Sequence, residues 1–330
     1  MAANPDSALT ANPDAVDPAQ GAAMPRGPFR LAVAMIVVTT ITILWGAMTT
    51  STGSGLAYLD WPTSEGQLMP ESSYTKLPQF FEHFHRLFGA TAGLCSLSLV
   101  VWLYVGRLGE PKVRGTALFG LILIITQGVI GGAHVLNGLP NATAVTHGTL
   151  AQLTLATFAW IAYQMTDRYR ATRPVEGVAP GSGRKLVIFA LVILVVQTVI
   201  GAIARHSNSP HALWTHVCNA FFVFFAATIA TAYANGKLGS TPGIRGIARW
   251  TVIVMIVQLA LGFVALAIRN AAGKTEENVA NLGTALVISV HVLLGAALTV
   301  LIATLAAHVF RATLPASTPR PAPRSAGAAP

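Results

Sequence analysis

Eight long apolar stretches constrain this chain more than any other feature of its sequence. They cover residues 31–50, 85–105, 115–135, 145–165, 186–205, 213–234, 249–269 and 284–310. A helix needs roughly 20 mainly apolar residues to cross the hydrocarbon core of a bilayer. Each stretch reaches about that length, so the sequence predicts an all-α integral membrane protein with eight transmembrane helices.

The composition agrees with a membrane protein and argues against a soluble one. Charged residues make up 10% of the chain and hydrophobic residues 53%, whereas soluble domains carry roughly 25% charged residues. The net charge of +9 would suit a protein that binds nucleic acid, but the basic residues are spread over short segments between the apolar stretches. We therefore predict no nucleic-acid partner.

The distribution of Lys and Arg predicts how the chain is oriented. If the N-terminus lies in the cytoplasm, most basic residues fall in the inner segments, and the outer segments keep only Lys76, Arg86, Arg205, Arg269 and Lys274. Cytoplasmic loops of membrane proteins are enriched in Lys and Arg. We therefore expect a multi-pass protein of the cell inner (plasma) membrane with both termini in the cytoplasm.

The chain also repeats itself. Gln127 and Gln258 occupy similar contexts in the third and seventh apolar stretches. The spacing between these two glutamines equals the spacing between His85 and His216. Each half would hold an even number of spans, which makes the repeat parallel rather than inverted. The sequence thus predicts two pseudo-symmetric four-helix bundles.

The predicted domains follow from this repeat and from the polar segments around it. They are a disordered cytoplasmic tail, an N-terminal four-helix bundle, a basic linker, a C-terminal four-helix bundle and a second disordered tail, at residues 1–30, 31–165, 166–185, 186–310 and 311–330. The tails lack apolar periodicity and are rich in Ala and Pro.

One histidine lies near the predicted outer end of every second apolar stretch: His85, His147, His216 and His291. A small residue follows each one four positions later, beside it on a helix, and leaves space for a flat macrocycle. Facing helices of a bundle that each supply one histidine can hold a heme through both. The pattern predicts two hemes near the outer face. An interhelical hydrogen-bonding role and a zinc site are the alternatives, but neither cysteine nor carboxylate recurs with the histidines.

The remaining histidines lie at the ends of apolar stretches or between them, and we expect them to be solvated or to face lipid headgroups rather than to bind metal. They are His83, His134, His206, His211 and His308. Three glutamines each precede a glycine by four residues and are expected to form hydrogen bonds between helices; they are Gln127, Gln197 and Gln258. Cys95 and Cys218 fall inside apolar stretches and are expected to be small buried hydrophobes.

Glu82 distinguishes the first predicted heme site from the second. It lies one helical turn before His85, whereas Leu213 occupies the corresponding position before His216. A carboxylate beside one site only suggests that the first site does chemistry and the second carries electrons. The alternative is a structural acid favoured by the helix dipole at an N-terminus.

The chain resembles the heme A synthase family at Glu82-x-x-His85-Arg86, and the resemblance extends over about residues 31–310. The segments Thr50-Ser51-Thr52-Gly53-Ser54-Gly55 and Asp60-Trp61-Pro62 look like the first outer loop of that family. The resemblance implies a membrane oxidoreductase of heme biosynthesis and cytochrome c oxidase assembly, which oxidises a ring methyl of heme O to the formyl group of heme A. Many members carry a cysteine pair in outer loops, and this chain has none.

The resemblance also implies the roles of the site residues. His85 and His147 would bind the substrate heme, His216 and His291 would bind the iron of a heme b cofactor, and Glu82 would be catalytic. The anionic heme propionates would face the outer interface, where arginines pair well with carboxylates. The predicted partners of the propionates are Arg86, Arg205 and Arg269.

The reaction implied is either successive hydroxylation of the methyl with loss of water, or electron withdrawal followed by attack of water with Glu82 accepting a proton. The expected partners are a heme O synthase (a protoheme farnesyltransferase) that delivers heme O, membrane lipid, an electron donor or acceptor, and a second copy of the chain. Two other functions stay open: a diheme cytochrome that only transfers electrons, and a transporter built from repeats.

Overall fold

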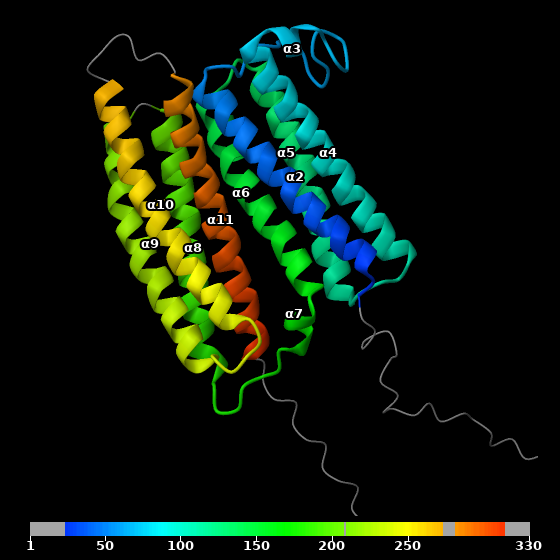
Figure 1. The fold of residues 1–330 in the computed structure, drawn as a ribbon, viewed down its shortest axis with the longest axis vertical. Coiled ribbons are helices and arrows are strands. Elements are labelled where there is room, and N and C mark those ends of the chain that lie inside the picture. The colour runs from blue at the N-terminus through cyan, green and yellow to red at the C-terminus, as the bar shows by residue number, and fades with distance from the viewer. Residues whose placement is uncertain (1–23, 208, 273–280, 314–330) are drawn as a thin grey trace, which may run out of the picture. The chain divides into compact units, whose positions relative to one another are not determined.

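The structure is a computed structural model that describes residues 24–207, 209–272 and 281–313. In these ranges the regular structure is helical, and the only β-type pairing is an isolated bridge between Ser64 and Gln67. The helices are α2 (Arg26–Ser51), α3 (Ser72–Thr75), α4 (Leu77–Val105), α5 (Pro111–Leu136), α6 (Asn141–Gln164), α7 (Asp167–Ala171), α8 (Pro180–His206), α9 (Pro210–Lys237), α10 (Ile244–Ala272) and α11 (Leu282–Ala312) (Figure 1). The predicted all-α class is confirmed.

Proline marks where several of these helices begin. Pro78, Pro111, Pro180 and Pro210 lie in the first turns of α4, α5, α8 and α9. Proline has no N–H, and the first turn of a helix has no acceptor for one, so proline is tolerated there. These helices begin before the apolar stretches predicted for them, because polar residues continue the helix outside the apolar segment.

Seven helices in the described part of the chain are long and apolar enough to cross a membrane: α2, α4, α5, α8, α9, α10 and α11. The remaining predicted span, residues 145–165, coincides with α6, which has 24 residues but contains several threonines and a histidine. The hydroxyls of Thr154 and Thr157 donate to carbonyls four residues earlier, at 2.8 Å each. Such bonds satisfy polar side chains within their own helix. The chain is a multi-pass membrane protein.

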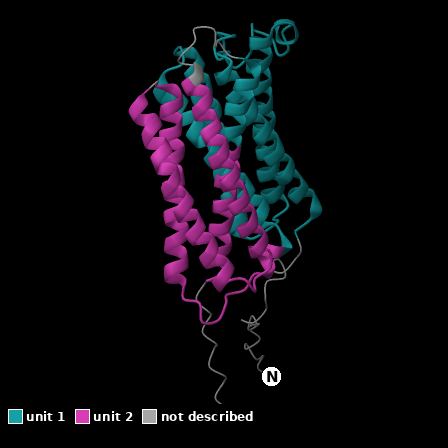
Figure 2. Cartoon of the chain, turned by 60° about the vertical axis from the view of Figure 1, so that its left-hand side comes forward, with its two compact units in different colours: residues 1–167, 275–293 teal, residues 168–274, 294–330 magenta. Residues whose placement is uncertain are grey.

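The helices form two compact units (Figure 2). Unit 1 comprises residues 1–167 and 275–293, and unit 2 comprises residues 168–274 and 294–330. In unit 1, α2 packs against α4 and α6, and α5 packs against the same two helices. The core of unit 1 contains fully buried large side chains: Met35, Leu99, Leu103, Phe158 and Ile161.

In unit 2, α9 packs against α8 and α10, and the C-terminal part of α11 contributes Ile302 and Leu305 to the same core. Arg184 lies at the end of α11, where its guanidinium donates to the carbonyl oxygen of Thr313 at 2.9 Å and to the Thr313 hydroxyl at 3.1 Å. The last carbonyls of a helix have no partner within the helix. Arg184 supplies one, which ties the start of α8 to the end of α11.

Some predicted boundaries differ from the observed ones. The first long helix begins at Arg26, so residues 26–30 of the predicted N-terminal tail are helical. The last helix ends at Ala312, so residues 311–312 of the predicted C-terminal tail are helical too. The remaining predicted tails, 1–23 and 314–330, lie outside the described residues. The predicted linker 166–185 contains α7 and the first residues of α8. The division of the second half into a separate bundle stays a prediction, since α11 contributes residues to both units.

The prediction that His308 is solvated is wrong. Its side chain is fully buried in unit 2, with Nε2 2.6 Å from the hydroxyl of Thr241. That hydroxyl donates its only hydrogen to the carbonyl of Leu238 at 2.7 Å, so His308 is the donor of the other bond. A position near a helix end suggests that water would be the hydrogen-bond partner of this imidazole. The buried hydroxyl of Thr241 is its partner instead.

Candidate functional site

Unit 1 brings together two of the four predicted heme ligands. The imidazole rings of His85 in α4 and His147 in α6 have centroids 6.2 Å apart and planes 83° apart. Imidazole nitrogens bind metal ions at roughly 2 Å, so two rings on opposite sides of one ion have centroids roughly 6 Å apart. The observed separation therefore suits a single iron ion between the two rings.

The surroundings of the ring nitrogens agree with this interpretation. His85 Nδ1 lies 2.9 Å from the carbonyl oxygen of Thr42. A carbonyl only accepts, so Nδ1 carries the proton and Nε2 keeps the lone pair that a metal needs. His147 Nδ1 is buried without a hydrogen-bond partner among the described residues. Among the described residues, no hydrogen bond therefore fixes the tautomer of His147 as one does for His85.

Two of the three predicted glutamine contacts between helices are observed. The side-chain amide of Gln127 in α5 donates to the backbone carbonyl of His147 at 3.0 Å. Gln197 in α8 donates to the carbonyl of His216 in α9 at 2.9 Å, and Asn219 donates to the Gln197 oxygen at 2.8 Å. These bonds fix the backbone of α6 and α9 at the predicted ligands.

His216 lies in unit 2, and its ring resembles that of His85 in its hydrogen bonding. Nδ1 is 3.3 Å from the carbonyl oxygen of Gln197, so it carries the proton. Nε2 lies 3.5 Å from the Gln197 amide nitrogen, which is at the long limit for a hydrogen bond. His291 belongs to the part of α11 that is assigned to unit 1.

Glu82 is buried, with 3% of its surface exposed, and holds the loop between α2 and α4. One carboxylate oxygen forms an ion pair with Arg86, and the other accepts the backbone N–H of Tyr58 at 3.0 Å. Arg86 in turn donates to the carbonyls of Tyr58, Asp60 and Thr63, at 3.3, 2.7 and 2.6 Å. Glu82 and Arg86 therefore fasten this loop to the segment of α4 that carries His85.

The Asp60-Trp61 segment of the loop is ordered by its own contacts. The Asp60 carboxylate accepts bonds from the hydroxyl of Thr63 at 2.9 Å and the N–H groups of Glu65 and Gly66 at 3.0 Å each. Burial raises the pKa of Asp60, but these hydrogen bonds outweigh it, so the pKa lies below its ordinary value. These contacts give this part of the loop a defined fold.

The indole of Trp61 rests on α5. A Cβ atom built on Gly132 would lie 2.6 Å from the indole ring, closer than any side chain could approach. Only glycine permits this contact, so the loop is fastened to α5 as well as to α4.

Several other sequence predictions need correction. His83 is buried rather than interfacial, with Nδ1 3.0 Å from the hydroxyl of Ser64 and Nε2 3.2 Å from the sulfur of Met69. The folded loop covers it, which the sequence did not indicate. Cys218 is exposed on its helix rather than buried, whereas Cys95 is half-buried.

Three further histidines that are not predicted ligands differ in how deeply they are buried. His134 is half-buried, with Nδ1 2.8 Å from the hydroxyl of Thr143. His206 is half-buried and His211 is exposed, so the predicted solvation stays a prediction for both.

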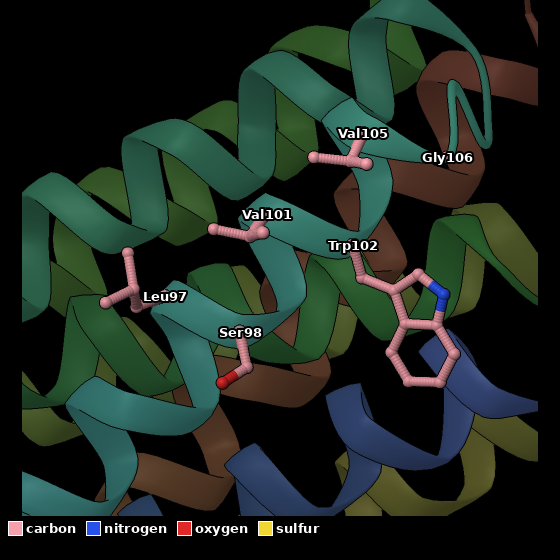
Figure 3. A pocket seen from close by; sticks show the side chains of 6 residues that line it. All are labelled: Leu97, Ser98, Val101, Trp102, Val105 and Gly106. Carbon is pink, nitrogen blue, oxygen red and sulfur yellow. The ribbon is translucent and has the colours of Figure 1, made fainter.

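One surface groove lies away from this site. It is lined by Leu97, Ser98, Val101, Trp102, Val105 and Gly106, all at the C-terminal end of α4 (Figure 3). None of these residues is ionisable, so the groove adds no chemistry to the histidine pair. Among the described residues, no cluster of three or more His, Cys, Asp or Glu side chains could bind a metal ion; a macrocycle that brings its own nitrogens requires only two.

The fold and the site define a multi-pass helical membrane protein with a half-buried histidine pair and a folded loop fastened to α4 near His85. The model of the cytochrome oxidase assembly protein family matches residues 29–213, which is more than half of the chain, and the chain belongs to this family.

Its relatives include a heme A synthase of Symbiobacterium thermophilum, 27% identical over 260 residues that cover 70% of this chain and 83% of the relative. A heme A synthase of Erythrobacter litoralis is 29% identical over 215 residues, 56% of this chain and 63% of the relative. One of Shouchella clausii is 24% identical over 199 residues, 60% and 64% of the two chains, so the matches cover less than two thirds of these last two relatives. The resemblance predicted from the Glu82-x-x-His85-Arg86 motif is confirmed.

Proposed function

We propose that this protein oxidises a ring methyl of heme O to the formyl group of heme A in the membrane. The observation that carries the proposal is the His85–His147 pair, whose ring centroids lie 6.2 Å apart next to a buried carboxylate. Family membership and the names of the relatives support it.

In this proposal, His85 and His147 bind the iron of the substrate heme, and Glu82 is the catalytic acid–base group. Arg86 forms an ion pair with the Glu82 carboxylate, which holds that carboxylate in place on α4. The loop held by Glu82 and Arg86 keeps bulk water from the site. Acid–base groups work best where geometry holds them close to the reacting atoms.

The second heme of the proposal is a heme b bound by His216 and His291. Heme b would supply reversible one-electron transfer to and from the first site. The Nδ1–H of His216 is held by the Gln197 carbonyl, so the residue can present Nε2 to iron. The proposal extends to an electron donor or acceptor and to delivery of heme O by a heme O synthase.

The heme propionates need cationic partners, for which we propose Arg86, Arg205 and Arg269. Arg86 donates to Tyr58, Asp60 and Thr63 through the two terminal guanidinium nitrogens. Arg269 donates to the carbonyl of Ala204 at 2.8 Å through one of them. The proposed topology has both termini in the cytoplasm and the heme sites near the outer face, in agreement with the basic inner segments.

The test is to produce the protein in cells that also make a heme O synthase and to identify the hemes extracted from the purified protein. We expect heme A or a hydroxylated intermediate beside heme B. His85→Ala and His147→Ala should abolish heme A, while His211→Ala, an exposed histidine, is the matched control. Heme B alone would indicate an electron-transfer cytochrome, and absence of heme would indicate a transporter; either result overturns the proposal.

A further inference from the structure

Three of the four predicted ligands share a contact that the proposed function does not require. Each imidazole ring lies directly on a glycine of the preceding long helix. A Cβ atom built on Gly46 in α2 would lie 2.6 Å from Cε1 of His85. One built on Gly201 in α8 would lie 2.6 Å from Cε1 of His216, and one on Gly131 in α5 would lie 3.1 Å from Cε1 of His147.

The three rings present the same edge to their glycines. In each case Cε1 is nearest to the position of the added Cβ, Nδ1 is next, and Nε2 is farthest, at 3.2 Å for Gly46, 3.5 Å for Gly201 and 3.9 Å for Gly131. Each glycine therefore selects a ring rotation in which Nε2 is the nitrogen farthest from the supporting helix.

A glycine at this place also uncovers a hydrogen-bond acceptor. Side chains on a helix point toward its N-terminus and cover the preceding turn. Gly46 and Gly201 cover nothing, and the carbonyls four residues earlier, of Thr42 and Gln197, accept the Nδ1–H groups of His85 and His216 at 2.9 and 3.3 Å. Glycine at these positions thus leaves space for the imidazole ring. It also exposes the backbone carbonyl that accepts the Nδ1–H and so fixes the tautomer of the histidine.

We propose that Gly46, Gly131 and Gly201 are positioning residues that orient the imidazoles of His85, His147 and His216 so that Nε2 is the iron-binding atom. The inference rests on the proposed function only in taking heme iron as the metal. Groups that orient a ligating histidine typically change metal affinity by about 10- to 100-fold when they are altered.

The experiment replaces each glycine by alanine and measures heme retention and the low-spin ferric spectrum of the purified protein. Alanine is the better helix former, so a loss cannot come from a weaker helix. Gly93, Gly128 and Gly181 are matched controls, because an added Cβ at each meets no atom within 4 Å. Gly128 lies three residues before Gly131 in the same helix, and Gly181 shares α8 with Gly201.

We expect Gly46→Ala and Gly201→Ala to weaken heme binding at their own site by about 10- to 100-fold and to shift the low-spin signal. Gly131→Ala should have a smaller effect, because its contact is 3.1 Å rather than 2.6 Å. The three control variants should bind heme as the unaltered protein does. Equal spectra and retention for Gly46→Ala, Gly201→Ala and the controls would overturn the inference.

A second measurement needs no heme. Nitrogen NMR of the heme-free protein with labelled histidine should show the Nδ1–H tautomer for His85 and His216, and Gly46→Ala and Gly201→Ala should shift their rings toward the other tautomer. An unchanged tautomer in both variants would contradict the inference. If the unaltered protein binds no heme but the tautomers respond, the proposed function fails while the positioning role stands.

Discussion

The Arg86 guanidinium pairs with the Glu82 carboxylate one helical turn away on α4, and only 12% and 4% of the two side chains is exposed. Both side chains also bond to the backbone of a single loop. Glu82 accepts the N–H of Tyr58, and Arg86 donates to the carbonyls of Asp60 and Thr63. In the proposed function, the chemistry and the attachment of the loop therefore depend on the same two residues, and substitutions can separate them.

Glu82→Gln should keep the bond from the Tyr58 N–H but remove proton exchange. We expect both hemes to bind, while formation of heme A falls by about 10²- to 10⁴-fold, the range of a lost acid–base group. The measurement is the ratio of heme A to heme O extracted from the protein. Glu71→Gln, an exposed acid of the same loop, is the control. Near-normal heme A from Glu82→Gln would show that the carboxylate is not catalytic.

Arg86→Gln should release the loop and leave Glu82 as a buried charge without its partner. Breaking a buried ion pair from one side costs about 3–5 kcal/mol, so the melting temperature should fall and amide exchange in residues 54–66 should accelerate. Arg86→Lys should behave almost as badly, since a single ammonium cannot reach three carbonyls in the guanidinium geometry. Lys76→Gln, an exposed basic residue next to α4, is the control. Unchanged exchange in the loop would refute the anchoring role.

The lowered pKa of Asp60 predicts how the stability of the loop changes in acid. Its folded pKa is below the ordinary value of 3.8, so its contribution to stability is present above that value and is lost as the pH falls through the folded pKa. Exchange protection of the Glu65 and Gly66 amides, corrected for intrinsic rates, should therefore drop as the pH falls from about 5 to below about 3. Asp60→Asn should show low protection throughout this range. A protection factor independent of pH in the unaltered protein would contradict the prediction.

Replacement of His216 or His291 by alanine should remove the low-spin b-type signal and leave the protein inserted in the membrane, because a bis-histidine heme needs both axial ligands. The measurement is the reduced-minus-oxidised optical spectrum together with the amount of protein in the membrane. His211→Ala, at the exposed start of α9, should leave the signal intact. A full bis-histidine spectrum in both variants would exclude these residues as ligands.

Much of the fold could be predicted from the sequence because the length and polarity of an apolar stretch depend on local composition alone. A helix covers each of the eight predicted spans almost entirely, yet α4 begins at Leu77 rather than near residue 85. Its first turns carry Glu82 and Arg86, and the partners of these polar residues come from a loop whose folding depends on contacts distant in sequence. The burial of His83 beneath that loop has the same origin.

The proximity of His85 and His147 could be predicted from the sequence, but the contacts that support the imidazole rings could not. The regular placement of His85, His147 and His216 near the ends of apolar stretches is visible in one sequence. The role of Gly46 or Gly201 depends on which face of one helix meets the next, and a chain rich in glycine does not reveal this. The recurring spacing of Gln127 and Gly131, and of Gln197 and Gly201, was the available signal.

The glycine contacts have a consequence for how the protein is made. Each supporting glycine and its histidine lie on consecutive long helices, α2 with α4, α5 with α6, and α8 with α9. Chains are synthesised from the N-terminus, and contacts between neighbouring elements form early and fast. Each of these histidines can therefore take its final orientation as soon as its own helical hairpin has entered the bilayer, before the rest of the chain has been made.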